Sequence, residues 1–155
     1  MASCTTGMEN RFFLGVDIGG TKTTVALGTD EGKVIQSAVF PTSTPDQTLR
    51  RVFAAAREFD ATRMQAIGIA CGDPLDSREG IIQSPPNLPH WDDVPITERL
   101  QEGFGCPAFL MNDANAGALA EWYFGAARGY RNVVFLTAGT GMGAGLILNG
   151  RLYEG

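Results

Sequence analysis

Two clusters of glycine most constrain how this 155-residue chain can fold. The first reads Asp-Ile-Gly-Gly-Thr-Lys over residues 17–22, and the second reads Thr-Ala-Gly-Thr-Gly-Met-Gly-Ala-Gly over residues 137–145. Each cluster stands between two short apolar stretches, a pattern typical of strands that are joined by tight turns. The sequence therefore predicts at least two strand–turn–strand units.

Apolar segments and helical patterns alternate along the rest of the chain. Strands are predicted at residues 11–16, 23–27, 34–40, 64–70, 108–111, 132–138 and 145–148, the last followed by an Asn149-Gly150 hairpin turn. Short glycine-containing connections favour an antiparallel meander for the first three. A helix is predicted to begin at Pro45, with Thr44 as N-cap and Gln47 completing a capping box. Further helices are predicted at 95–102, closed by Gly103, and at 114–124.

This order of elements favours an α/β fold with one mixed sheet flanked by helices. The last two strands repeat the opening scheme of strand, glycine turn and strand. The chain is 44% hydrophobic and 19% charged, which is enough apolar material for a core and excludes a disordered or fibrous protein. Residues 1–10 are small and polar and contain no helix or strand pattern, so a disordered tail is the expectation there.

Charge and cysteine usage exclude further classes. The net charge of −5 repels phosphate backbones, so nucleic acid is not an expected partner. Three scattered cysteines form neither a disulfide framework nor a zinc-type pair, so zinc is not expected within this chain. No apolar run is long enough to span a membrane and no signal-peptide core precedes Arg11, so we expect a cytoplasmic protein without a membrane partner.

The first glycine cluster carries groups that suit a phosphate. Successive backbone N–H groups without Cβ atoms form an anion-binding concavity. Gly19 and Gly20 would supply such amides, Thr21 a hydroxyl group, and Lys22 a cation. Asp17, at the end of the predicted strand, would hold Mg²⁺ through water. The alternative is an ordinary hairpin turn that uses glycine for its geometry.

The second cluster contains a formal G-x-G-x-x-A match at Gly139, Gly141 and Ala144, which is the dinucleotide-binding fingerprint. That fingerprint needs a helix next, whereas a short apolar run and a hairpin turn follow. A hairpin that embraces a phosphate therefore fits better. A nicotinamide-dependent dehydrogenase stays as a rival hypothesis.

Between the clusters, Asn112 and Asp113 end a predicted buried strand and open a helix. Their side chains should lie at the carboxyl edge of the sheet, where ligands bind in α/β folds. The alternative is an ordinary helix N-cap, for which Asn and Asp are favoured. One cap residue suffices, however, and here Asn112, Asp113 and Asn115 crowd one turn.

Together these segments resemble the ROK family of bacterial-type sugar kinases and their regulator relatives. The similar segments are Asp17–Lys22 (DIGGTK), Ser84–Trp91 (SPPNLPHW), Asn112–Asn115 (NDAN) and Thr137–Gly145 (TAGTGMGAG), and the resemblance covers residues 11–155. It implies the actin/hexokinase-like fold, in which two RNase H-like halves enclose a cleft. Residues 11–112 would be the N-terminal half, and residues 113–155 the interdomain helix and the opening hairpin of a truncated second half.

The resemblance also implies an ATP-dependent kinase that acts on a hexose or an N-acetylhexosamine, with ATP and Mg²⁺ required. Asp113 would be the general base that takes a proton from a sugar hydroxyl. The phosphates would be bound by Asp17, Gly19, Gly20, Thr21, Lys22, Gly139, Thr140, Gly141 and Gly143. The sugar would be bound by Gly72, Asn87, Asn112 and Asp113.

The chain departs from the family in two residues and in length. Many relatives have glycine where Asp73 and His90 stand, and these side chains either alter sugar choice or face solvent, the second being our expectation. The family's Glu-plus-His sugar motif, zinc cluster and adenosine-binding segment have no counterpart here. The isolated chain is therefore expected to show little or no kinase activity.

A second hypothesis is a non-catalytic sugar-sensing module, like the family's regulators. Those proteins carry a DNA-binding helix-turn-helix ahead of the kinase-like part, whereas only about ten residues precede the first predicted strand here. The expected partners are therefore ATP and a small sugar. Which sugar is bound stays open, and so does the oligomeric state, with a homodimer as one expectation.

Overall fold

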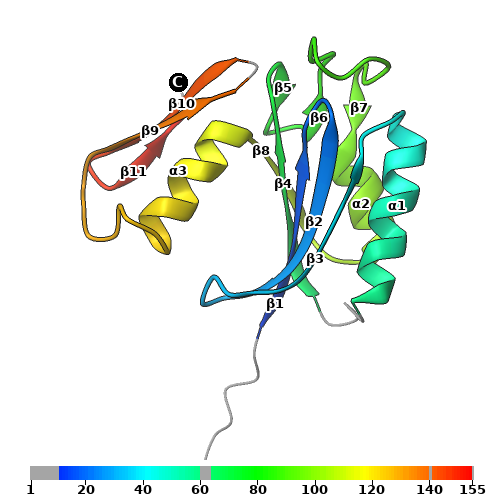
Figure 1. Cartoon of the computed structure of the whole chain (residues 1–155), viewed down its shortest axis with the longest axis horizontal. Helices are drawn as coiled ribbons and strands as arrows, with labels where there is room; N and C mark the ends of the chain where they lie inside the picture. Colours follow the sequence, from blue (N-terminus) through cyan, green and yellow to red (C-terminus); the bar gives the residue numbers. More distant parts are fainter. Residues whose placement is uncertain (1–10, 60–63, 140, 155) are drawn as a thin grey trace, which may run out of the picture.

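A computed structural model describes residues 11–59, 64–139 and 141–154. Its largest sheet has five strands in the order β3-β2-β1-β4-β8 (Figure 1). These strands are β1 (Phe12–Ile18), β2 (Lys22–Thr29), β3 (Val34–Pro41), β4 (Met64–Cys71) and β8 (Ala108–Asn112). The first three form an antiparallel meander, and β1 pairs in parallel with β4, as does β4 with β8. The predicted mixed sheet and meander are confirmed.

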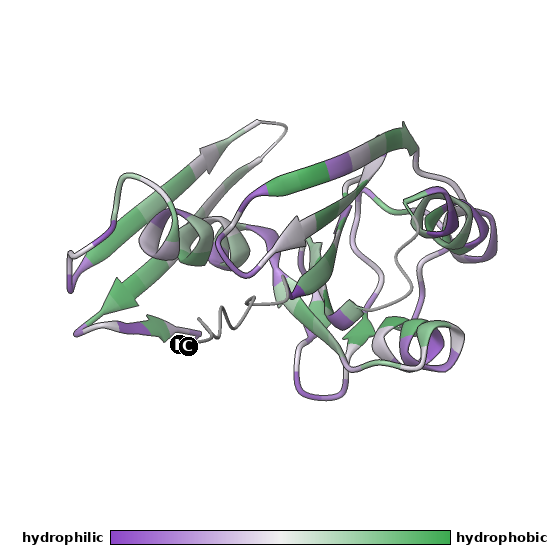
Figure 2. Ribbon diagram, turned by 90° about the horizontal axis from the view of Figure 1, so that it is seen from below, coloured by the Kyte–Doolittle hydropathy of each residue, from purple (hydrophilic) through white to green (hydrophobic). Residues whose placement is uncertain are grey.

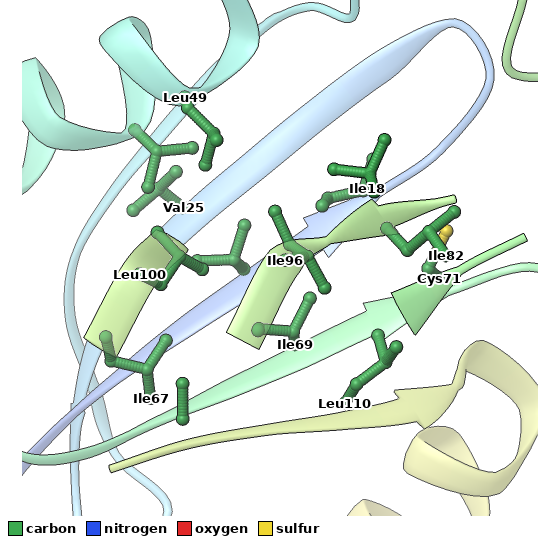
Figure 3. Close-up of a cluster of buried hydrophobic side chains, with 14 of the residues drawn as sticks. Ile18, Val25, Leu49, Ile67, Ile69, Cys71, Ile82, Ile96, Leu100 and Leu110 are labelled. Atoms are coloured by element: carbon green, nitrogen blue, oxygen red, sulfur yellow. The ribbon is translucent and has the colours of Figure 1, made fainter. Parts of the chain in front are cut away.

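Two helices, α1 (Pro45–Glu58) and α2 (Ile96–Phe104), cover one face of this sheet (Figure 1). The strands alternate as a sheet with one buried face requires. On β1, for example, Leu14, Val16 and Ile18 are buried, whereas Gly15 and Asp17 are exposed. Figure 3 shows the resulting core, in which side chains of β4 meet those of α2. The side chain of Asp17 therefore lies on the face away from this core.

The second sheet is antiparallel and follows the helix α3 (Asp113–Tyr123). Its order is β11-β10-β9, with β9 (Val133–Ala138), β10 (Met142–Leu148) and β11 (Arg151–Tyr153). The backbone of β10 lies against α3 so closely that a Cβ atom at Gly145 would collide with the carbonyl oxygen of Ala114. The predicted Asn149-Gly150 turn is confirmed, because both residues have the positive φ angles of such hairpins.

Three local predictions are corrected. The loop after β4 contains a small sheet of β5 (Leu75–Asp76), β6 (Ile81–Ile82) and β7 (Val94–Pro95) that the sequence did not reveal. Helix α2 ends at a left-handed Gly105 rather than at Gly103, which lies inside the helix against Phe53. Thr44 is the N-cap of α1 but makes no side-chain cap bond, and Gln47 completes no capping box, because its Oε1 atom accepts a hydrogen bond from the Ser43 hydroxyl.

Candidate functional site

The carboxyl ends of three parallel strands meet at one edge of the five-stranded sheet. Ile18 of β1 pairs with Cys71 of β4, and Cys71 pairs with Asn112 of β8. This shared register brings together the residues at the strand ends, although they are far apart in the sequence. The edge lies at the top of Figure 1, where α3 also begins. It is the edge at which α/β proteins bind ligands, as the sequence predicts for Asn112 and Asp113.

The amide of Asn112 is held on both sides. Its Oδ1 atom accepts hydrogen bonds from the backbone N–H groups of Ala114, at 2.9 Å, and Asn115, at 3.2 Å. Its Nδ2 atom donates to Oδ2 of Asp73 at 2.8 Å. Asn112 is therefore the N-cap of α3, which was the alternative to a ligand-binding role. Its NH₂ group, however, is directed to Asp73 at the sheet edge and not to the helix.

Asp113 is the first residue of α3 and is exposed. One carboxylate oxygen, Oδ1, accepts a hydrogen bond from the backbone N–H of Ala114 at 2.7 Å. The other oxygen makes no hydrogen bond to any described residue. Asp113 thus has one oxygen that fixes the side chain and one that is available to a ligand. A carboxylate placed in this way can accept a proton from a hydroxyl group within reach.

The electrostatics connect the acids of this edge. Loss of solvent raises the pKa of Asp17, the charge of Asp113 raises it further, and Lys22 lowers it. Burial, followed by the charge of Asp113, raises the pKa of the Cys71 thiol to about 12; the backbone of Gly72 opposes the shift, and Asp17 and Asp73 add to it. Three carboxylates therefore act on the end of β4.

The first glycine turn is tied to other loops. The hydroxyl group of Thr42 donates to the carbonyl oxygen of Gly19 at 2.7 Å. A Cβ atom at Gly20 would stand 2.5 Å from the backbone oxygen of Asn87. Packing alone thus requires glycine at position 20. Thr21 and Lys22 are exposed beside it.

The second glycine turn joins β9 to β10, so a strand and not a helix follows the G-x-G-x-x-A match. This removes the structural basis of the dehydrogenase hypothesis. A Cβ atom at Gly139 or Gly141 would meet no described atom within 4 Å, and neither residue has a left-handed φ. Gly143, in contrast, lies against Thr137 and Ala114. Thr140 lies outside the described residues.

The loop predicted to bind the sugar, residues 84–91, is anchored by its buried tryptophan. Trp91 is fully buried, and its Nε1 atom donates to the carbonyl oxygen of Ser43 at 2.8 Å. Asn87 is exposed on this loop, next to the first glycine turn. His90 is exposed, as expected, and its φ of 72° lies in the left-handed region that favours glycine.

Two features of this site were missed by sequence reasoning. Asp73 is exposed, as expected, but its carboxylate is bound to Asn112 rather than free in solvent. A pocket of about 370 Å³ opens beside this pair and reaches the second sheet; its lining includes Asp73, Ser77, Asn112, Asn115 and Tyr153. The sequence marked Asp73 only as a departure from the family's glycine, two residues after a buried strand, and gave no signal for its bond to Asn112. Gly72 lies next to it, and a Cβ atom there would meet no described atom within 4 Å.

The acidic side chains at this edge suit Mg²⁺ that keeps part of its water shell better than a metal ion coordinated by protein side chains alone. Within the described ranges, no group of three or more His, Cys, Asp or Glu side chains is placed to hold a metal ion. Mg²⁺ commonly keeps several waters and binds through one or two carboxylates together with substrate phosphates. The carboxylate of Asp17, which remains accessible although it has lost part of its solvent, meets that requirement.

No helix in the described part of the chain is both long and apolar enough to cross a membrane.

The mixed sheet, the flanking helices and the second antiparallel sheet define a protein of the actin/hexokinase-like fold class. The chain belongs to the ROK family, whose model matches residues 13–155. It is 37% identical over 146 residues to a glucokinase of Thermotoga maritima, covering 92% of this chain and 46% of that protein. It is also 31% identical over 153 residues to a xylose repressor of Bacillus spizizenii.

Solved structures show the same likeness. A ROK family glucokinase from Streptomyces griseus, in complex with glucose and AMPPNP, matches 93% of this chain with a TM-score of 0.83 and 31% identity. A ROK hexokinase from Thermus thermophilus matches 93% with a TM-score of 0.81 and 40% identity. This chain covers 46% and 49% of those two chains. It therefore spans about half the length of the relatives that it matches.

Proposed function

We propose that this chain is the N-terminal part of an ATP-dependent sugar kinase that transfers the γ-phosphate to a hydroxyl group of a hexose or an N-acetylhexosamine. Residues 11–112 form its first RNase H-like half, and residues 113–155 open the second. In this proposal Asp113 is the general base. Asn112, Asn87 and Gly72 bind the sugar.

The observation that carries the proposal is the position of Asp113 beside Asp17 and the second glycine turn. One carboxylate oxygen of Asp113 makes no hydrogen bond to a described residue, and the charge of Asp113 raises the pKa of Asp17. The β9–β10 hairpin lies against the first turn of α3, where Gly143 approaches Ala114. A base, a phosphate turn and a second acid are thus grouped at one edge.

The open glycines support a phosphate ligand. Neither packing nor backbone conformation within the described chain requires glycine at positions 139 and 141. Glycine there lets an anion approach the backbone without meeting a Cβ atom, although the N–H of Gly139 itself donates to the carbonyl oxygen of Gly141 at 2.9 Å. Thr140 lies between them in the sequence, and Thr21 and Lys22 serve the phosphates from the other turn, where the N–H of Gly19 already donates to the carbonyl oxygen of Lys22 at 3.0 Å.

Phosphoryl transfer depends mostly on positioning and on stabilising charge. Mg²⁺, when bound, would neutralise phosphate charge near Asp17. Asp113 would take the proton of the sugar hydroxyl as it attacks. Asn112, whose amide is held by α3 and Asp73, would orient that sugar.

Two experiments test the proposal. The 155-residue chain is titrated with AMPPNP and Mg²⁺ by NMR, and we expect shifts in both glycine turns. A chimera then joins the chain to the second half of the Thermotoga maritima glucokinase, with glucose and ATP as substrates. Asp113→Asn should lower its kcat by about a hundredfold or more. Unchanged turnover would remove Asp113 as the base.

A sugar-sensing module without catalysis is the second candidate. The likeness to a xylose repressor and to a ROK family transcriptional regulator, the latter with a TM-score of 0.79, favours it. It predicts sugar binding by the chain without nucleotide binding. Titration with AMPPNP therefore separates the two candidates.

A further inference from the structure

The carboxylate of Asp73 is bound to Asn112, which ends β8 and is the N-cap of α3. Oδ2 of Asp73 accepts from Nδ2 of Asn112 at 2.8 Å. The orientation of the Asn112 amide is not free, because its oxygen already accepts from two backbone N–H groups of α3. The NH₂ group must therefore point toward Asp73.

This arrangement forms a fixed donor–acceptor pair. One amide hydrogen of Asn112 is used by Asp73, and the second makes no hydrogen bond to a described residue. The other oxygen of Asp73, Oδ1, likewise accepts from no side chain or backbone group in the described ranges. Both groups line the same pocket of about 370 Å³. A free N–H donor and a free carboxylate acceptor thus stand side by side.

We propose that Asp73 is a specificity-determining residue of the sugar site, where Asp73 and Asn112 together bind two neighbouring hydroxyl groups of a neutral sugar. This inference rests on the proposed function. Asn112 donates to the oxygen of one hydroxyl, and Asp73 accepts the proton of the next. No residue of the glycine turns takes part.

The chemistry of the pair explains the selectivity. A carboxylate accepts hydrogen bonds only, and a charge-assisted bond to a hydroxyl is stronger than a neutral one. A sugar that lacks one of the two hydroxyls would leave a polar group of the pair unsatisfied. Glycine at position 73 could not make this contact. Asp73 therefore adds a requirement for one particular hydroxyl.

The test measures binding rather than turnover, with D-glucose as the probe. The 155-residue chain is titrated with D-glucose and with its 2-, 3- and 4-deoxy analogues by NMR. The variants are Asp73→Ala, which removes the acceptor, and Asp73→Asn, which keeps a partner for Asn112 but removes the charge. Asp30→Ala, an exposed acid in the β2–β3 turn, loses the same charge elsewhere. Thermal unfolding confirms that each variant is folded.

We expect the unmodified chain and Asp30→Ala to bind two deoxy analogues, which lack adjacent hydroxyls, roughly fivefold more weakly than D-glucose. Asp73→Ala should bind D-glucose and one of these analogues alike, because it loses only the contact with the hydroxyl that Asp73 binds, and Asp73→Asn should lie between the two. If Asp73→Ala keeps the full dependence on the hydroxyl, the inference is wrong while sugar binding stands. If neither D-glucose nor N-acetylglucosamine binds the unmodified chain, both this inference and the proposed sugar site fail.

Discussion

Asp17 and Asp113 share one edge of the five-stranded sheet, and the charge of Asp113 raises the pKa of Asp17. They come from opposite sides of β4, which pairs in parallel with both β1 and β8. Loss of solvent is the larger cause of the shift, and Lys22 opposes it. Two acids that no local pattern connects are therefore electrostatically coupled by the sheet.

Replacing Asp113 by Asn should lower the pKa of Asp17. The charge that disfavours ionised Asp17 disappears, but desolvation remains, so the pKa should fall only part of the way to 3.8. NMR titration of the carboxyl carbon measures it directly. Asp73→Asn is the matched control, because Asp73 is not among the groups that shift Asp17. An unchanged pKa in Asp113→Asn would show that the two carboxylates do not face each other.

The raised pKa of Asp17 also predicts a pH dependence of stability. Folded Asp17 holds its proton more tightly than unfolded Asp17, so this group's contribution to stability falls as pH rises from 3.8 through the raised pKa. Asp17→Asn removes that penalty. We expect a higher Tm for Asp17→Asn near neutral pH and no gain from this source well below 3.8. A gain that is equal at acidic and neutral pH would contradict this assignment.

Substitutions of Gly139, in the second glycine turn, and of Gly145, on β10, should separate binding from stability. Gly139→Ala adds a Cβ that meets no described atom within 4 Å, so the free energy of unfolding should stay within about 0.5 kcal/mol. AMPPNP binding, if the turn holds phosphate, should weaken. Gly145→Ala should destabilise the chain by about 1–3 kcal/mol, because its Cβ would collide with the backbone of α3.

Urea unfolding and AMPPNP titration of both variants measure these effects. Strong destabilisation by Gly139→Ala would mean that the turn needs glycine for its own fold. The phosphate interpretation of position 139 would then lose its support.

Much of the architecture was predictable because it depends on local signals. The meander follows from apolar stretches joined by tight turns, and the β10–β11 hairpin follows from Asn149-Gly150. The place of Asn112 and Asp113 follows from a rule about strand ends in α/β folds. In each case the deciding residues are neighbours in the sequence.

The remaining features depend on contacts between distant segments. Gly20 is restricted by Asn87, and Gly103 by Phe53, so neither glycine could be interpreted from its own neighbours. The two-residue strands β5, β6 and β7 are too short for a periodic pattern. The bond between Asp73 and Asn112 joins two strand ends and has no sequence signature.

Cys71 should be nearly unreactive in the folded chain. Its pKa of about 12, against an ordinary value of 9.0, lowers the thiolate fraction at mildly alkaline pH by about a thousandfold. In a Cys4→Ser background, iodoacetamide should modify half-buried Cys106 much faster than buried Cys71. In urea the two rates should become similar. Mass spectrometry of tryptic peptides resolves the two sites, and equal rates in the folded chain would contradict the assigned environment of Cys71.

The second sheet carries an exposed apolar face on the side away from α3. Val134 and Leu136 are each 64% exposed, and Met142 is 82% exposed, on strands that Figure 2 colours largely hydrophobic. The opposite face of the same strands packs on α3, where Phe135 lies against Gly117 and the backbone of Gly145 lies against Ala114. An apolar surface of this kind favours association. The 155-residue chain should therefore self-associate as its concentration rises.

Leu136→Lys should reduce this association without changing the Tm, because the side chain is exposed in the monomer. Ile35→Lys, at a 45% exposed position on β3, is the matched control and should leave association unchanged. Sedimentation velocity over a range of concentrations measures both. Association that Ile35→Lys abolishes and Leu136→Lys does not would place the contact on the first sheet, because a lysine acts only where its own surface is buried by the partner.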